Sequence, residues 1–381
     1  MVCKFFNAFT LYDIKDLSMT SNSLNISATI SRQTGEAKNK NTLAFCVDEN
    51  YLPYALFTAE QFIRLHPELP CDICICLPDI SKVPDKLKNK QIRFIELSIS
   101  GIDALPVGRL SLAAYHRLFL PQIFENTYEY IVYLDADTYI NKAFYKKLLI
   151  CIDSFSKNFC VAAAADIMEL KVRSHLKERQ KKVDLYVKTY HKLNHIYRNS
   201  GVLVFNTDNY NKSNILNKVF AYAVDNAESL QCHDQSALNG ALLDNIALLP
   251  FDFNWQIHKT TYQITDTINP YIIHFISDNK PWKMDNKFTE GYQDYYKIFL
   301  EENFPETIAD ILTAYEQRCR TPKYKNPVRE FFSIQGHRLK NSADSIQSKL
   351  STLQKNKNNI QNLLIRKPFL VSTDHFNSED N

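Results

Sequence analysis

The sequence predicts an α/β protein with a mostly parallel, twisted β-sheet flanked by helices on both faces. Two patterns predict this fold: short apolar runs have the length of buried strands, and amphipathic segments with helical spacing lie between them. Strands that alternate with helices form parallel pairs through right-handed crossovers. Apolar residues make up 45% of the 381-residue chain, which is enough for a substantial core.

Several apolar runs after residue 40 are expected to form the strands of this sheet. They are residues 43–47, 72–77, 92–97, 130–134, 159–165 and 201–205. One expected helix follows the first run and carries its apolar face at Leu56, Ala59, Phe62 and Ile63. A second helix is expected near residues 111–126. The charged segment 171–194 is predicted to be a helical insertion, a lid or part of the acceptor side.

The composition divides the chain into three parts. Residues 1–38 are polar, rich in Ser, Thr and Asn, and without periodicity, so they are expected to be a loose extension. Residues 39–300 contain the strand and helix pattern and are expected to form the main domain. Residues 301–381 are expected to be a helical, basic region.

Positive charge is concentrated near the end of the chain. The formal net charge is +3, which is too small to indicate a nucleic-acid-binding protein. Residues 321–370 contain ten Lys and Arg but only Glu330 and Asp344 as acids, which predicts contact with an anionic surface such as a membrane. Within them, apolar residues at heptad spacing fit a coiled coil, a helix on the body or a membrane-surface helix. These are Ala343, Ile346, Leu350, Leu353, Ile360 and Leu364.

The cysteines and the hydropathy predict a cytoplasmic protein, peripheral at the inner face of the cytoplasmic membrane. The chain has nine cysteines, shows no secretory signal pattern and contains no apolar run long enough to cross a membrane. Reduced thiols fit such a compartment. Cys71, Cys74 and Cys76 lack a second pair at zinc spacing, so we expect them in the core.

An apolar run that ends in two acidic residues is the strongest chemical signal. Asp135, Ala136 and Asp137 follow the run 130–134. In extended backbone both carboxylates would project to one side at the carboxyl end of a strand, where open α/β sheets bind ligands. Oxygen ligands of this kind suit Mg²⁺ or Mn²⁺ with diphosphate oxygens completing the shell. The alternative is an ordinary solvated turn.

Five further segments accompany this acidic motif in a fixed order. The full set is Phe45–Tyr51, Ser111–Leu118, Asp135–Asp137, Arg198–Leu203, His233–Asn239 and Ile272–Trp282. Together they resemble the retaining glycosyltransferases of family 8, which include bacterial lipooligosaccharide galactosyl- and glucosyltransferases and the glycogenins. The resemblance covers roughly residues 41–285. It implies a GT-A-type fold, with residues 39–300 as the catalytic domain.

The resemblance implies a set of donor-binding residues. Asp48 and Asn50 would bind the base and ribose of a UDP-sugar, and Tyr51 would stack on uracil. Lys280 would pair with diphosphate oxygens. The remaining positions implied to contact the donor are Cys46, Arg117, Asp135, Ala136, Asp137, Asn199 and Ser277. Ser277 stands where relatives usually have Gly, and its side chain would crowd a backbone contact to phosphate at that residue.

The resemblance also implies the metal ligands and the catalytic residues. Asp135, Asp137 and His274 would bind Mn²⁺ or Mg²⁺. Asp234 would bind hydroxyls of the donor sugar, and Gln235 would lie beneath its anomeric carbon. Arg117 would lie near the sugar and the diphosphate. Taken one at a time, these residues have ordinary interpretations as well, such as a surface Arg117 or Asp234 as a helix N-cap.

Retention of anomeric configuration requires either two inversions or replacement on a single face. A double displacement needs a carboxylate nucleophile beneath the anomeric carbon. Gln235 offers an amide, which is a poor nucleophile, so the sequence favours attack on the same face as the departing group.

The function implied is transfer of galactose or glucose from UDP to a saccharide acceptor, in the synthesis of lipopolysaccharide or lipooligosaccharide. The acceptor is expected to be lipid-linked. One alternative is a glycogenin-like enzyme that glucosylates itself or another protein, which the 21 tyrosines leave open. Another is a non-catalytic scaffold that binds sugar nucleotides.

Overall fold

The structure is a computed structural model, and it describes most of the predicted main domain. The described residues are 26–88, 91–102, 105–106, 113–169, 196–230, 232–258, 261–284, 286 and 288–320. The predictions for the insertion at 171–194 and for the heptad pattern at 343–364 lie outside these residues.

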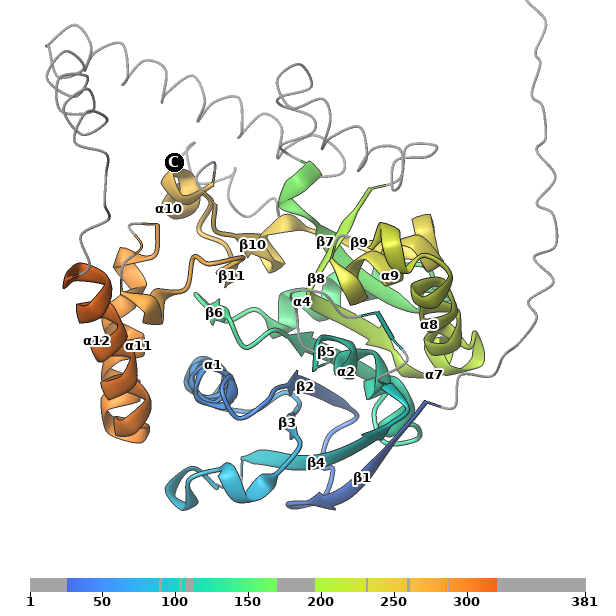
Figure 1. Cartoon of the computed structure of the whole chain (residues 1–381). Coiled ribbons are helices and arrows are strands. Elements are labelled where there is room, and N and C mark those ends of the chain that lie inside the picture. Colours follow the sequence, from blue (N-terminus) through green and yellow to red (C-terminus); the bar gives the residue numbers. More distant parts are fainter. Residues whose placement is uncertain are drawn as a thin grey trace, which may run out of the picture.

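A large twisted sheet forms the centre of the molecule (Figure 1). Among the described residues it has eight strands in the order β1-β4-β3-β2-β5-β8-β7-β9. Its strands are β1 (Ser27–Gln33), β2 (Asn41–Cys46), β3 (Asp72–Leu77), β4 (Ile92–Ser100), β5 (Tyr130–Leu134), β7 (Val161–Ala165), β8 (Arg198–Asn206) and β9 (Ile246–Leu249). Strands β4, β3, β2 and β5 are parallel to one another, whereas β8 runs antiparallel to both of its neighbours. The predicted α/β class is confirmed.

Helices cover both faces of this sheet. They are α1 (Leu52–Leu65), α2 (Ala113–His116), α3 (Leu120–Ile123), α4 (Tyr145–Asp153), α7 (Thr207–Lys212), α8 (Ile215–Asp225), α9 (His233–Leu242), α10 (Thr265–Ile268), α11 (Glu290–Asn303) and α12 (Pro305–Arg320). Successive strand residues face opposite sides: Phe45 belongs to the core that contains residues of α1, α4 and α11, and Ala44 to the core that contains residues of α8 and α9. Helices α8 and α9 accordingly lie across the sheet from α1 (Figure 1). The central strands are therefore buried on both faces, as their continuous apolar runs predict.

A second, small sheet determines where the functional residues meet. It consists of β10 (Trp255–Gln256), β11 (Ile272–His274) and β6 (Thr138–Ile140), in that order. The central strand β11 is parallel to β10 and antiparallel to β6. Because β6 follows β5 after a short turn, this pairing brings residues near 274 to the carboxyl end of β5.

The predicted apolar runs all coincide with strands, with small differences at their ends. The predicted apolar face of α1 is confirmed, since Leu56, Ala59 and Phe62 are fully buried. Cys71 is buried as well, and Cys74 and Cys76 on β3 face the core, which confirms that these thiols are core residues.

The prediction of a loose extension over residues 1–38 is wrong for Ser27–Gln33. This segment is the edge strand β1, and it pairs antiparallel with β4. The Arg32 guanidinium strengthens the pairing through an ion pair with Glu96, with 2.5 Å between Nη2 and Oε2. Ile26, Ala28 and Ile30 alternate with polar residues, but this run is short and the strand is exposed along most of its length, so the prediction missed it.

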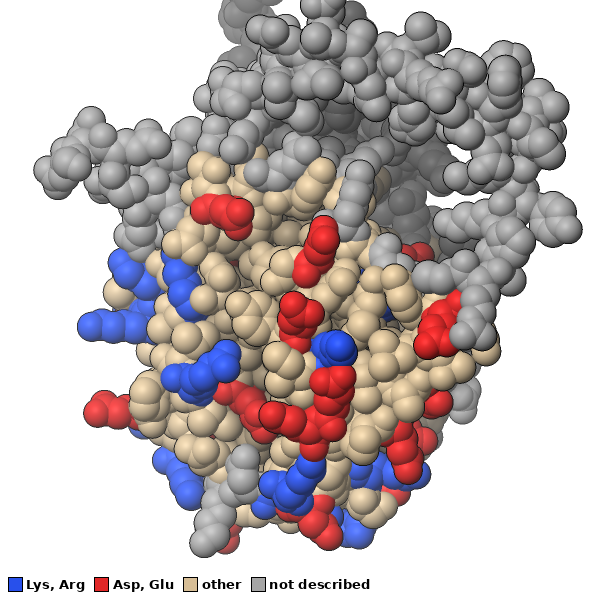
Figure 2. All heavy atoms as spheres, turned by 90° about the vertical axis from the view of Figure 1, so that its left-hand side faces the viewer, with Lys and Arg blue, Asp and Glu red and all other residues tan. Residues whose placement is uncertain are grey.

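The predicted boundary at residue 300 is also wrong. Helix α11 crosses it, and Ile308 on α12 is buried in the same core as α1. The described part of residues 301–381 is helical but not basic, because Glu301, Glu302, Glu306, Asp310 and Glu316 outnumber its basic residues. Figure 2, which looks onto this side of the molecule, shows acidic and basic side chains interspersed on its surface. Within residues 301–381 the expected basic character is therefore confined to residues after 320.

No helix among the described residues is long and apolar enough to cross a membrane.

Candidate active site

The two acidic residues after β5 lie in a turn, not in extended backbone as the sequence predicted. Asp135, Ala136 and Asp137 connect β5 to β6, and the Thr138 amide donates to the Asp135 carbonyl over 3.2 Å. The Asp135 amide donates to the Gly201 carbonyl of β8 over 2.8 Å, which fixes the start of the turn. Ala136 is buried in the core, so only its backbone is available to a ligand. The carboxylate groups of Asp135 and Asp137 nevertheless lie close together.

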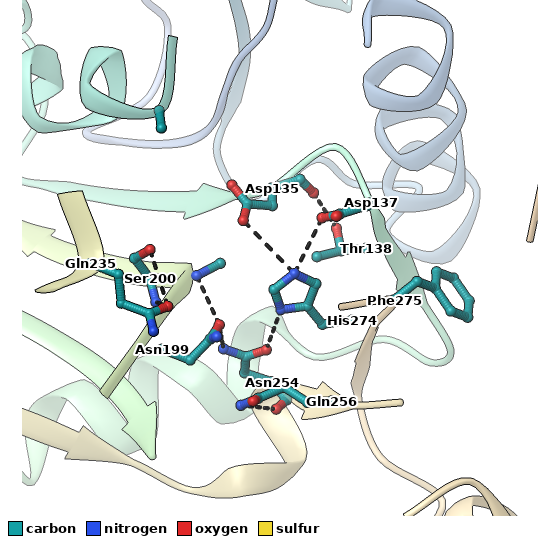
Figure 3. Close-up of polar contacts among 12 residues, drawn as sticks. Asp135, Asp137, Thr138, Asn199, Ser200, Gln235, Asn254, Gln256, His274 and Phe275 are labelled. Atoms are coloured by element: carbon teal, nitrogen blue, oxygen red, sulfur yellow. Dashed lines mark hydrogen bonds and ion pairs between the residues drawn. The ribbon is translucent and has the colours of Figure 1, made fainter. Parts of the chain in front are cut away.

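His274 joins this acidic pair through the small sheet. It pairs with Thr138 across β11 and β6, and the next amide, of Phe275, donates to the Asp137 carbonyl over 2.9 Å. Its Nε2 lies 3.2 Å from Asp137 Oδ1 and 3.8 Å from Asp135 Oδ2 (Figure 3). Three side chains that are far apart in sequence therefore form one cluster.

The cluster has the donor set and the arrangement of a divalent-cation site. One ligand atom from each of Asp135, Asp137 and His274 lies within 4.8 Å of the other two. Asp137 Oδ1 is buried and accepts no hydrogen bond, and a buried carboxylate oxygen without a partner is costly unless a cation satisfies it. Two carboxylates and an imidazole suit Mn²⁺ or Mg²⁺. The residues present fit such an ion.

Arg117 is buried beside the acidic pair, which excludes the alternative of a surface arginine. The expected helix at 111–126 is interrupted here: α2 and α3 are separated by a 3₁₀ turn at Arg117–Phe119. The guanidinium Nη1 donates to Asp135 Oδ1 over 2.6 Å, and Nε lies 3.4 Å from Asp234 Oδ2. Although burial lowers the pKa of Arg117, the charges of Asp135 and then Tyr133 and Asp234 outweigh it and raise this pKa. Arg117 is a fixed cation between two carboxylates.

Asp234 lies inside the first turn of α9, not at its N-cap. The N-cap position is Cys232, and Asp234 is buried. Burial is the largest influence on the pKa of Asp234 and raises it, while the Arg117 guanidinium opposes this rise. The alternative of a simple helix cap is therefore wrong.

Lys280 provides a second buried cation on the other side of the cluster. Its ammonium donates to Asp137 Oδ2 and, over 2.5 Å, to the Phe275 carbonyl. Burial raises the pKa of Asp137, but the Lys280 ammonium and His274 lower it more strongly, and the net pKa is well below the usual value. Asp137 is therefore ionised at neutral pH, as a metal ligand must be.

Tyr51 offers an exposed ring at the entrance to the cluster. Its side chain is 41% exposed, and its amide donates to Asp48 Oδ1 over 3.0 Å at the start of α1. Burial of its hydroxyl, followed by the charge of Asp137, raises the pKa of Tyr51 to about 12. Trp282 stacks on Tyr54 at 3.7 Å between ring centroids and meets Tyr51 edge-on. The Trp282 ring thus holds the loop after β11 against α1.

Two of the predicted donor residues adjoin this entrance without contacting the acidic pair. Asn50 is exposed beside Tyr51. Cys46 is half-buried at the end of β2, next to Cys76 of β3.

Ser277 adopts a backbone conformation that favours glycine. Its φ angle is 56°, in the left-handed region that costs a non-glycine residue about 1–2 kcal/mol. Glycine would adopt this angle without that cost. The Ser277 side chain is exposed, so it does not crowd the core of the cluster.

Gln235 and Asn199 belong to a buried amide network. Gln235 Oε1 accepts from the Ser200 amide over 3.0 Å, and its Nε2 donates to Asp166 Oδ2 over 3.1 Å. Asn199 also donates to Asp166 Oδ2, over 2.9 Å. Figure 3 shows Gln235 beside Ser200, and Asn199 beside Asn254, which contacts the His274 ring.

Three residues of this site were not found from the sequence. Asp166 follows the buried strand β7 just as Asp135 follows β5, and that pattern was a usable signal. Asn254, which contacts His274, and Tyr133, which donates to Asp135 Oδ1 over 2.6 Å, had no comparable signal. Tyr133 lies within an apolar strand, and Asn254 precedes a strand of only two residues.

Comparison with known proteins assigns this arrangement to a family. The family described as "Glycosyl transferase family 8" matches residues 42–286. Among curated relatives, General stress protein A of Bacillus subtilis is 25% identical over 293 residues, which cover 70% of this chain and 94% of that protein. Glycosyltransferase GlyF of Streptococcus pneumoniae is 21% identical over 201 residues, 51% of this chain and 44% of the relative.

Solved structures share the fold. The galactosyltransferase LgtC, in complex with donor and acceptor sugar analogues, superposes with a TM-score of 0.54 at 18% identity, covering 69% of this chain and 96% of LgtC. The bifunctional glycosyltransferase WbbM gives a TM-score of 0.53 at 18% identity, covering 74% of this chain and 52% of WbbM. At this identity the likeness establishes a GT-A-type architecture and no more.

Proposed function

Since the chain belongs to glycosyl transferase family 8, we propose that it transfers galactose or glucose from a UDP-sugar to a saccharide acceptor with retention of configuration. The observation that carries this proposal is the cluster of Asp135, Asp137 and His274, whose ligand atoms lie within 4.8 Å of one another. An exposed Tyr51 ring and two buried cations adjoin it.

The cations and the ring have separate roles in binding the donor. Tyr51 stacks on uracil, because a flat exposed ring at the mouth of a polar site suits a base. Asp48 and Asn50 provide hydrogen bonds to base and ribose. Lys280 turns from Asp137 to the diphosphate oxygens, for which an ammonium is a mobile point charge. Arg117 remains between its carboxylates and faces the sugar side.

Asp135, Asp137 and His274 hold Mn²⁺ or Mg²⁺. When bound, such an ion supplies positive charge that stabilises the departing diphosphate. Two of these side chains are already suited to bind a cation, because Asp137 is ionised and Asp135 is oriented by Arg117 and Tyr133. Preorganised charge of this kind is usually the largest contribution to catalysis in group transfer.

Attack on the same face as the departing group fits the hydrogen bonding of Gln235. Both polar atoms of its amide are engaged, with Ser200 and with Asp166, so neither is free to attack carbon. The acceptor oxygen forms its bond to the anomeric carbon as the bond to the β-phosphate oxygen breaks. That phosphate oxygen takes the acceptor proton, and UDP leaves with the bonding electrons.

A lipid-linked saccharide at the cytoplasmic membrane, in lipopolysaccharide synthesis, is the acceptor that we propose. Helices α11 and α12 carry more acidic than basic residues, so we do not assign the attraction to an anionic membrane to them. The ten basic residues of 321–370 supply the attraction instead.

A panel of UDP-sugars tests the proposed function. We expect hydrolysis of UDP-galactose or UDP-glucose with Mn²⁺ and without acceptor, and loss of this hydrolysis in EDTA. Intact mass after incubation separates release of free hexose from glucosylation of the protein itself. Failure to bind or hydrolyse any UDP-sugar would contradict the proposal and favour a scaffold.

A further inference from the structure

A chain of buried amides connects the His274 imidazole to a carboxylate that contacts neither of the acidic pair. Its members are Asp166, Asn199, Asn254 and His274, and they lie on or beside β7, β8, β10 and β11. All four are at most 6% exposed. Figure 3 shows Asn254 between Asn199 and the imidazole. The orientation of each amide can be deduced from its partners.

The chain begins at Asp166 and at a backbone amide, which together orient Asn199. Asp166 Oδ2 lies 2.9 Å from Asn199 Nδ2, and an ionised carboxylate only accepts hydrogen bonds. The Gly201 amide lies 3.0 Å from Asn199 Oδ1 and only donates. Both neighbours therefore require the same orientation, with the Asn199 NH₂ group toward Asp166.

Asn199 in turn orients Asn254. Its Oδ1 also lies 2.9 Å from Asn254 Nδ2, so the Asn254 NH₂ group must donate to it. The carbonyl oxygen Oδ1 of Asn254 is then the atom that faces the imidazole, 3.0 Å from Nδ1 of His274. A carbonyl oxygen accepts and cannot donate, which places the proton on Nδ1.

We propose that Asn254 is a positioning residue that fixes the tautomer of His274, so that the unprotonated Nε2 faces Asp135 and Asp137. Nε2 lies 3.2 Å from Asp137 Oδ1 and 3.8 Å from Asp135 Oδ2, so in this tautomer its lone pair is available to a cation that it would share with the two carboxylates. Metal-binding histidines commonly donate their other nitrogen to such an outer partner. The proposal rests on the metal site of the proposed function.

The test compares two buried amides of the same short segment. Asn254→Leu removes the acceptor for Nδ1, while Gln256→Leu is the matched control. Gln256 is equally buried, and its side chain binds the Ala165 carbonyl and the Ile167 amide without contacting the imidazole. Both variants lose a buried amide, so any general destabilisation of the fold should affect the two variants alike.

Two measurements are made on the full chain at pH 8. The histidine tautomer is read from the metal-free protein by NMR, and the Kd for Mn²⁺ is measured by calorimetry. Nitrogen-15 spectra of the histidine rings report which nitrogen carries the proton, with His274 assigned from a His274→Gln variant. We expect the Nδ1–H form in wild type and in Gln256→Leu, and a mixture in Asn254→Leu. We expect the Kd for Mn²⁺ to rise about 10- to 100-fold only in Asn254→Leu.

The outcomes separate this proposal from the proposed function. An Nε2–H form in the wild-type spectrum would overturn the proposal, even if Asn254→Leu fails to fold. The proposal would also be overturned if Asn254→Leu kept the wild-type tautomer and Kd for Mn²⁺. The same holds if Gln256→Leu weakened Mn²⁺ binding as much as Asn254→Leu does. Absence of Mn²⁺ binding by wild type with the expected tautomer would instead contradict the metal site.

Discussion

Asp135→Ala is expected to lower sugar transfer by at least about 1000-fold, the scale seen when a preorganised charge contact to a transition state is lost. The substitution removes one of the three ligand groups and takes away the carboxylate that Arg117 and Tyr133 hold. The measurement is kcat for transfer or hydrolysis with saturating Mn²⁺.

Glu129→Ala is the matched control for this variant. Glu129 precedes β5 at its other end, is exposed and forms an ion pair with Lys40. Its loss should leave kcat within twofold, since exposed ion pairs contribute about 0–1 kcal/mol. Normal activity of Asp135→Ala, or wild-type activity that persists after removal of the metal, would refute the assigned role.

Gly201→Ala is expected to weaken metal binding although Gly201 is not itself a metal ligand. A Cβ atom at this position would lie 2.1 Å from Cε1 and 2.6 Å from Nδ1 of His274. Strand β8 is paired on both sides and cannot retreat easily, so the imidazole must move. We expect the Kd for Mn²⁺ to rise by at least about tenfold, with a parallel loss of activity.

Gly291→Ala provides the control for this second substitution. Nothing lies within 4 Å of a Cβ built at Gly291 on α11, and alanine favours a helix. The Kd for Mn²⁺ should be unchanged and the protein slightly more stable. If Gly201→Ala binds Mn²⁺ as wild type does, then His274 either tolerates displacement or is not a ligand.

Much of the sheet could be predicted because its strands are buried on both faces. A strand such as β3 has no polar face, so its apolar run stands out in the sequence. The edge strand β1 is mostly exposed, and its short alternation of Ile26, Ala28 and Ile30 with polar residues was missed. The direction of β8 was also not predictable, because strand direction depends on the connections and not on the composition of the strand.

The candidate site was predicted in part, through motifs that combine local chemistry with order along the chain. Asp135 and Asp137 follow a recognisable strand, but their turn geometry depends on the pairing of β6 with β11. Asn254 was missed because a single amide in a loop resembles any polar residue. Its place beside His274 becomes visible only when β10 and β11 pair.

Anomalous diffraction from crystals grown with Mn²⁺ and UDP tests the central claim most directly. The account predicts a manganese peak bound by carboxylate oxygens of Asp135 and Asp137 and by Nε2 of His274. A peak held by UDP alone, or one bound elsewhere on the protein while this cluster remains empty, would contradict it.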